Sequence, residues 1–272
     1  MTSVRSHLQS RHKIGTTLKI GIVIPTYNEV ENLSGLVTTL FALPLDLSVL
    51  IVDDNSPDGT GDLGNELAQY NPKLFVLHRP EKLGLTSAYV QGFYYFLERK
   101  MEVIGQMDAD GSHDSAALMA MVKCLEGCDV VFGSRYVRDG AVDPQWSFWR
   151  KSLSIIGNLY ARIILRVPVQ DMTTGFRLWR TDTLRCMPLE NILSKGYIFQ
   201  VEMAYLAHCL EYRIMEYPIH FADRRQGESK MSLQIQLEAL LCTWQIWSTH
   251  HHLCHIGRAA RTPHTFQSNM LH

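Results

Sequence analysis

The sequence has no long hydrophobic run. No uninterrupted apolar stretch approaches the roughly 18 residues that a membrane-spanning helix requires, so the sequence predicts no such helix. Residues 1–18 also lack the apolar centre of a secretory signal. They are basic and rich in Ser and Thr, which favours a flexible basic tail and leaves a transit peptide as the alternative. We therefore expect a cytoplasmic protein.

Cysteine is scarce, and its spacing does not support a structural zinc site. Only Cys124 and Cys128 stand close together, and the second pair that such a site needs is missing. We expect free or buried thiols in a reducing compartment. The six cysteines are Cys124, Cys128, Cys186, Cys209, Cys242 and Cys254.

Neither sign of charge dominates. Lys+Arg 26 and Asp+Glu 27 give a formal net charge of −1, so bulk charge does not favour nucleic acid as a partner. No G-x-G-x-x-G follows the first strand, and the chain contains no G-x-x-x-x-G-K-[ST]. Dinucleotide-binding and P-loop functions are therefore disfavoured, and a bound diphosphate would need another source of positive charge.

Apolar runs alternate with helical patterns through the first half of the chain. With 272 residues, 46% of them hydrophobic, the chain is long enough for a sizeable core. Short strands separated by helices predict an α/β fold with a mostly parallel central sheet and flanking helices. The five expected strands are LKIGIVIP, LSVLIVDD, KLFVLHR, EVIGQMDAD and CDVVFGS.

Asp108 and Asp110 stand at the end of the fourth expected strand. Residues i and i+2 of a strand point to the same side, where two carboxylates repel each other unless a cation lies between them. By itself the motif fits a turn as well as a metal site. Similar polar clusters follow the other strands, and ligands bind beyond the carboxyl ends of parallel strands. This coincidence favours the metal, and oxygen ligands in an open site suit Mg²⁺ or Mn²⁺.

The second half is richer in basic side chains. Residues 144–167 predict a long amphipathic helix that places Arg150 and Ser154 on one face, at i and i+4. Arg224 and Lys230 flank a glycine loop after an apolar strand. Ordinary surface charge would explain most of these cations, whereas Arg and Lys beside a metal are what phosphate groups require.

Seven short motifs occur in order along residues 20–235. They are PTYNEVENL, VDDNSPDGT, MDADGSH, GSRY, DMTTGFR, KGYIFQVEM and PIHFADRRQGESKMS. Together they resemble the catalytic domain of dolichol-phosphate mannosyltransferases, within the family 2 glycosyltransferases. The resemblance implies a GT-A fold over residues 19–232, a GDP-mannose donor, a dolichol or polyprenyl phosphate acceptor and a divalent metal.

The resemblance also implies roles for individual residues. The nucleoside would contact Pro25, Tyr27, Glu29, Val52 and Asp54, and the ribose, diphosphate and metal would contact Asp108, Ala109 and Asp110, with Ser112 as a further metal ligand. The acceptor phosphate would face Arg135, Arg150 and Ser154, while Arg224 and Lys230 would clamp the donor diphosphate. The expected catalytic set is Asp110, Arg135, Arg224 and Lys230.

The chain departs from the family pattern in its metal loop. Gly111 stands where a leucine is usual, and Ser115 stands where a proline often follows the histidine, which puts the rigidity of this loop in doubt. Two other functions stay open: a polyprenyl-phosphate glucosyltransferase that uses UDP-glucose, and a non-catalytic homologue that binds a nucleotide sugar.

A phosphate acceptor sets the expected chemistry. Its second pKa of about 6 makes it an anion near neutral pH, so we assign no catalytic base. Arg224, Lys230 and the metal would stabilise the leaving diphosphate, and Arg135 and Arg150 would draw in the acceptor anion. A single in-line attack would invert the anomeric carbon and give a β-linked product.

A lipid acceptor requires contact with a membrane. Residues 233–249 predict an amphipathic helix whose leucines and tryptophans, Leu233, Leu237, Leu240, Leu241, Trp244 and Trp247, follow helical spacing. This stripe either lies on the cytoplasmic face of the membrane, so that the protein is peripheral, or packs on the catalytic domain. A membrane partner subunit is a third way to reach the lipid. We expect residues 250–272 to form a flexible tail.

Overall fold

The first half of the chain forms a regular alternation of strands and helices. The computed structural model describes residues 18–222 and 233–261, and the side chains of the last helix from 240 to 254. The elements of the first half are β1 (Lys19–Thr26), α1 (Val30–Phe41), β2 (Asp46–Asp53), α2 (Thr60–Tyr70), β3 (Leu74–His78), α3 (Leu85–Glu98), β4 (Val103–Gln106), α4 (Ala117–Cys124) and β5 (Val130–Ser134). The five strands expected in this half are all present.

The second half is less regular. Its elements are β6 (Ala141–Val142), α5 (Phe148–Leu165), β7 (Arg177–Arg180), α6 (Thr181–Arg185), the 3₁₀ helix η2 (Leu189–Asn191), α7 (Ile198–Cys209), β8 (Ile214–Pro218), β9 (His220–Phe221) and α8 (Leu233–Arg261). The short elements β6, α6, η2 and β9 were not expected, because they are too brief to carry a hydrophobic period.

Seven strands form the central sheet in the order β3-β2-β1-β4-β7-β5-β8. All neighbouring pairs are parallel except those of β7, which runs antiparallel to β4 and to β5. The mostly parallel sheet is therefore confirmed. The chain passes from β1 to β2 on one side and returns to β4 on the other side of β1, so a topological switch point lies there.

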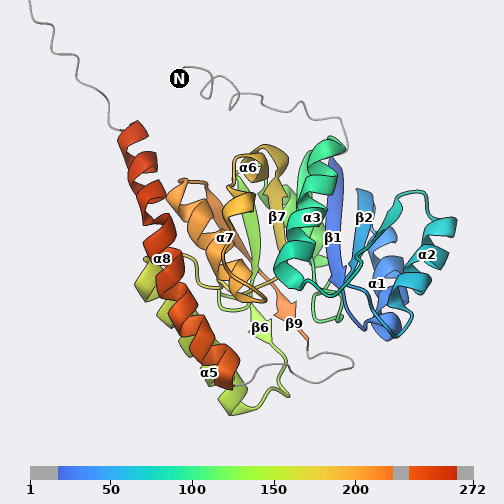
Figure 1. The fold of residues 1–272 in the computed structure, drawn as a ribbon, viewed down its shortest axis with the longest axis horizontal. Coiled ribbons are helices and arrows are strands. Elements are labelled where there is room, and N and C mark those ends of the chain that lie inside the picture. The colour runs from blue at the N-terminus through green and yellow to red at the C-terminus, as the bar shows by residue number, and fades with distance from the viewer. Residues whose placement is uncertain (1–17, 223–232, 262–272) are drawn as a thin grey trace, which may run out of the picture.

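Both faces of the sheet are covered (Figure 1). Along β1, Ile22 and Ile24 pack with Leu33 of α1 on one face, and Val23 packs with Phe93 of α3 on the other. This near-continuous apolar pattern is typical of a strand buried on both sides. Helix α3 lies so close to the sheet that a Cβ on Gly92 would stand 2.2 Å from Val23 Cγ1.

Helices α5, α7 and α8 form a layer at one end of the sheet, with α8 beside α7 and α5 (Figure 1). Among the described residues, no helix is both long and apolar enough to cross a membrane. The structure extends α8 to Arg261, past residue 249 where the helix was expected to end, so residues 250–261 are helical and not part of the expected flexible tail.

The expectation of free thiols is wrong for one pair of cysteines. Cys209 at the end of α7 and Cys254 in α8 form a disulfide. Their separation of 45 residues in the sequence gave no signal of this pairing, which depends on the packing of the two helices. Cys124, Cys128, Cys186 and Cys242 do not form disulfides.

Candidate active site

The polar clusters of the sequence meet at the carboxyl edge of the sheet. Thr26 ends β1, Asp53 ends β2, and Asp108 follows β4. Since β1, β2 and β4 are parallel neighbours, these chain ends lie together at the switch point. The structure thus brings together the first three motifs.

Asp108 is partly exposed, and both of its carboxylate oxygens contact neighbours. The Tyr89 hydroxyl donates to Oδ1 at 2.8 Å, and His113 Nε2 lies 3.3 Å from Oδ2. Gly175 faces the same carboxylate so closely that a Cβ there would lie 2.6 Å from Oδ2. Burial, and then the charge of Asp108, raises the pKa of Tyr89 well above its ordinary value, so the phenol keeps its proton and remains a donor.

Asp110 is buried and is tied to its own loop. Its Oδ1 accepts the backbone N–H of Ser112 at 3.1 Å and also the Ser112 hydroxyl. Gly111 between them has φ 73°, in the left-handed region that favours glycine. The glycine that departs from the family pattern therefore permits the turn that folds Ser112 back onto Asp110.

The chemistry of these groups fits a small divalent cation. The described residues contain no group of three or more His, Cys, Asp or Glu side chains that would enclose a metal. Asp108, Asp110 and Ser112 offer two carboxylates and a hydroxyl at an open edge. Mg²⁺ commonly binds in this way, through one or two carboxylates, waters and substrate phosphates.

The residues expected to hold the nucleoside lie at the ends of β1 and β2. Asp54 is buried and accepts Arg79 Nη1 and the backbone N–H groups of Leu83 and Gly84, each at 2.8 Å. The Val52 side chain lies in the core, so only its main chain faces the edge. The Asp54 carboxylate thus organises residues 79–84 in addition to any contact with a ligand.

The other residues expected at the nucleoside are half-buried or held by main-chain bonds. Pro25 is half-buried in β1, and Lys82 Nζ lies 3.5 Å from the centre of the Tyr27 ring. The backbone N–H of Glu29 donates to Thr60 Oγ1 at 2.9 Å. Ala109, between the two aspartates, is buried. The contacts of these residues with a nucleoside stay predictions.

Arg135 is buried and held by Asp171, a residue that the sequence analysis did not single out. Its Nε and Nη2 each donate to a different oxygen of Asp171 at 2.7 Å, and Nη2 also donates to Thr173 Oγ1. Burial raises the pKa of Asp171, but the charge and hydrogen bonds of Arg135 outweigh burial and lower it. The guanidinium is therefore locked in place, with Nη1 as the edge that is not bound to Asp171.

Ser154 and Arg150 of α5 contact aromatic side chains that lead back to the aspartates. Tyr136 donates to Ser154 Oγ at 2.6 Å, and the guanidinium carbon of Arg150 lies 3.9 Å from the centre of the Trp146 ring. Phe221 touches Trp146 edge to face, and it touches His113 in the same way. Arg135 also lies over Phe221, so this aromatic ring joins the expected acceptor residues to the Asp108 side of the site.

Antiparallel β7 is what brings Asp171 and Gly175 to the site. Because β7 begins at the carboxyl edge of the sheet, Gln106 at the end of β4 pairs with Arg177 at its start. Arg177 is fully buried and donates to the carbonyls of Met172 and Gln200 at 2.8 Å. Burial lowers the pKa of Arg177 to about 9. The DMTTGFR motif indicated in the sequence that this segment is functional, but it did not indicate that Asp171 contacts Arg135 or that Gly175 contacts Asp108.

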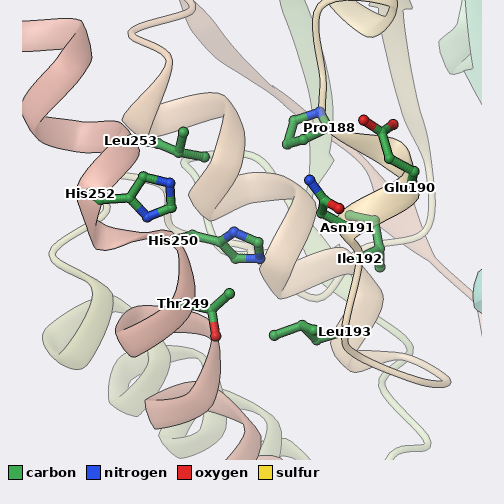
Figure 2. A pocket seen from close by; sticks show the side chains of 9 residues that line it. All are labelled: Pro188, Glu190, Asn191, Ile192, Leu193, Thr249, His250, His252 and Leu253. Carbon is green, nitrogen blue, oxygen red and sulfur yellow. The ribbon is translucent and has the colours of Figure 1, made fainter.

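A second polar cluster ties α8 to the loop before α7. Glu202 accepts the backbone N–H of Ser194 at 2.8 Å and lies 2.7 Å from His250 Nε2. Thr86 of α3 donates to the Ser194 carbonyl. Beside this cluster a pocket of about 370 Å³ lies between residues 188–193 and residues 249–253 of α8 (Figure 2). None of the residues expected to bind substrate lines this pocket.

Helices α5 and α8 lie in contact, and each exposes apolar side chains. The Tyr160 hydroxyl of α5 donates to the Leu240 carbonyl of α8, so the two helices lie in contact. Phe148 is 83% exposed and Trp149 is 79% exposed. The exposed apolar side chains of the two helices are Phe148, Trp149, Leu153, Ile155, Ile156, Leu159, Ile163, Leu240, Leu241, Trp244 and Trp247. We call this set the α5–α8 face.

Two predicted residues, Arg224 and Lys230, lie outside the described residues, and so do the side chains of Leu233 and Leu237. The remaining predicted residues are placed as given above. Their roles toward a substrate stay predictions.

Comparison with known proteins identifies relatives over most of the chain. A model of the family described as glycosyl transferase family 2 matches residues 21–187. An undecaprenyl-phosphate mannosyltransferase from Micrococcus luteus is 44% identical over 224 residues, which is 82% of this chain and 92% of that protein. A polyprenol monophosphomannose synthase from Mycolicibacterium smegmatis is 41% identical over 78% of this chain and 80% of that protein.

Solved structures share the fold at low sequence identity. A mannosyltransferase from Pyrobaculum calidifontis, in complex with GDP-Man and Mn²⁺, has a TM-score of 0.52 at 14% identity, covering 90% of this chain and 81% of that one. Mannosyl-3-phosphoglycerate synthase from Rubrobacter xylanophilus has a TM-score of 0.58 at 14% identity, covering 93% and 79%. At this identity the likeness supports the fold alone.

Proposed function

The chain belongs to the family 2 glycosyltransferases and has a GT-A-like fold, and we propose that it transfers mannose from GDP-mannose to a dolichol or other polyprenyl phosphate. The observation that carries the proposal is the pair of curated relatives, which match this chain over most of their own length and whose names specify mannosyl transfer to such lipids. The arrangement of charged groups at the sheet edge supports it.

Asp108, Asp110 and Ser112 would hold the divalent cation, Mg²⁺ or Mn²⁺. The chemistry that such a cation supplies is neutralisation of the negative charge on the departing diphosphate. The half-exposed Asp108 carboxylate faces the edge, whereas the Asp110 carboxylate is oriented from within its loop by Ser112. Arg224 and Lys230, which lie outside the described residues, are proposed to bind the donor diphosphate.

The acceptor phosphate would be bound by the second half of the chain. Nη1 of Arg135 points away from the Asp171 carboxylate that holds the other two nitrogens. Arg150 on its tryptophan and Ser154 on Tyr136 supply further polar groups from α5. A phosphate monoester is already an anion near neutral pH, so these residues act by binding and orienting it, and no side chain needs to remove a proton. A single in-line attack inverts the anomeric carbon.

The α5–α8 face gives the protein a surface for the membrane that holds the lipid. The exposed tryptophans Trp149, Trp244 and Trp247 suit a membrane interface, where aromatic rings are enriched. The protein would then be a peripheral enzyme on the cytoplasmic face of the membrane. The sequence predicted membrane contact through α8 alone, and we now include α5, the helix that carries Arg150 and Ser154. A membrane partner subunit would occupy the same face.

Vesicle flotation tests this membrane contact. The variant Trp149→Ser/Ile156→Ser removes apolar area from α5 while leaving α8 intact. We expect the wild type to float with vesicles that contain anionic lipid and the variant to remain largely in the soluble fraction. Tyr70→Ser, on α2 at the opposite end of the sheet, is the matched control because Tyr70 is similarly exposed. Equal flotation of all three proteins would refute direct membrane contact through α5.

A donor screen tests the reaction itself. Purified full-length protein is incubated with a polyprenyl phosphate, Mn²⁺ and either GDP-mannose or UDP-glucose, and the lipid product is identified by mass spectrometry. We expect a mannosyl lipid phosphate from GDP-mannose and none from UDP-glucose. A glucosyl product alone would overturn the proposed donor, and no product from either donor would favour a non-catalytic homologue.

A further inference from the structure

Tyr89 lies beneath the two aspartates and is held rigidly. Its ring is fully buried in α3 and stacks on Phe199 of α7 at 5.6 Å between ring centres, with an interplanar angle of 9°. Phe93 stacks on it at 6.0 Å. Full burial and contact with two aromatic rings restrict the Tyr89 ring, which places its hydroxyl close to the end of β4.

That hydroxyl donates a hydrogen bond to Oδ1 of Asp108 from the α3 side. The bond to Oδ1 is 2.8 Å long, while His113 contacts Oδ2 and Gly175 limits the space beside Oδ2. Asp108 is the more exposed of the two aspartates and sits at the tip of a strand, where an unsupported carboxylate would rotate freely. These three neighbours therefore restrict its orientation.

We propose that Tyr89 is a positioning residue that fixes the Asp108 carboxylate in the orientation needed to bind a divalent cation. The inference rests on the proposed metal site. Carboxylates that bind metals are commonly held by outer hydrogen bonds, and loss of such a bond typically costs 10–100-fold in metal affinity or activity. A tyrosine that only fills the core would leave metal affinity unchanged when its hydroxyl is removed.

The test is Tyr89→Phe in the full-length protein, because phenylalanine keeps the ring stack and removes only the hydroxyl. Mn²⁺ affinity is measured by EPR titration in the presence of GDP and, in parallel, of UDP, without a sugar donor. We expect affinity to fall about 10-fold or more, with a thermal midpoint close to that of the wild type. Tyr95→Phe is the matched control, since Tyr95 lies on the same helix but packs on Phe75 of the distant strand β3.

A second variant perturbs the other oxygen of the Asp108 carboxylate, Oδ2. Gly175→Ala would place a methyl group against Oδ2 and displace the carboxylate while leaving the Tyr89 hydroxyl in place. We expect it to weaken Mn²⁺ binding as well. The inference is overturned if Tyr89→Phe binds Mn²⁺ as tightly as the wild type does, whatever the thermal midpoint of the variant. It is also overturned if the wild type binds no Mn²⁺ with either nucleotide. The two proposals can fail separately. If Tyr89→Phe weakens Mn²⁺ binding but the donor screen yields no mannosyl lipid, the proposed donor is overturned and this inference stands.

Discussion

Replacing Asp171 by Asn should destabilise the protein strongly, because Asp171 compensates the buried charge of Arg135. The Asp171 side chain is fully buried, and that of Arg135 is 7% exposed. One Asp171 oxygen accepts both the backbone N–H and Nε of Arg135, and the other accepts Nη2. Asparagine has the same size, but its amide places an NH₂ donor opposite one of these donors in either orientation.

The magnitude follows from the burial of the pair. Removing one partner of a buried ion pair leaves an uncompensated charge and typically costs about 3–5 kcal/mol. For a chain of this size each kcal/mol lowers the thermal midpoint by roughly 2–4 °C, so we expect a fall of roughly 6–20 °C. The assay is thermal unfolding followed by circular dichroism, with urea unfolding as a second measure of the free energy change.

A more exposed ion pair in the same protein provides the control. Arg213 donates to Asp129 at 3.1 Å, and the side chains of Arg213 and Asp129 are 66% and 15% exposed. Asp129→Asn should therefore cost only about 0–1 kcal/mol. If Asp171→Asn destabilises the protein no more than Asp129→Asn does, the guanidinium of Arg135 does not depend on Asp171, and the account of a locked, oriented Arg135 is wrong.

Three further predictions concern the metal loop, the acceptor and pH. Asp110→Ala should abolish mannosyl transfer with folding retained by circular dichroism, and transfer that survives excess chelator would contradict the metal role. Arg150→Ala should raise the KM for the lipid phosphate at least several-fold and leave the KM for the donor nearly unchanged; equal acceptor KM values would make Arg150 a surface residue only. Burial raises the pKa of Glu202, but hydrogen bonds from His250 and Ser194 outweigh burial, so its folded pKa lies below 4.5. The stability that this lowered pKa contributes is fully present above about pH 4.5 and is lost as pH falls through the folded value. As the pH falls below about 4.5, the thermal midpoint of the wild type should therefore drop more steeply than that of Glu202→Gln, and parallel curves would refute this role.

Much of the first half of the fold could be predicted from local patterns. The runs at 47–54 and 102–110 combine apolar residues with terminal aspartates, and a buried strand that ends at a binding edge has this signature. Parallel neighbours then place Asp53 and Asp108 at the same edge without any knowledge of side-chain packing. The loop that carries Asp108 and Asp110 was located for the same reason, and its role as a metal site stays a prediction.

The sequence by itself determined the α/β class, the edge at which the carboxylates gather and the motifs that indicate the family, because each of these depends on residues close together in the chain. Only the tertiary structure decided which residues, distant in the sequence, contact Arg135 and Asp108. The antiparallel insertion of β7 between β4 and β5 brings Asp171 to Arg135 and Gly175 to Asp108. The hydrophobic period of α5 is the same for a helix packed on a core and for one with an exposed face, so only packing against α8 showed which side chains remain exposed. Long-range contacts of this kind depend on how whole elements pack, and no local spacing records that packing.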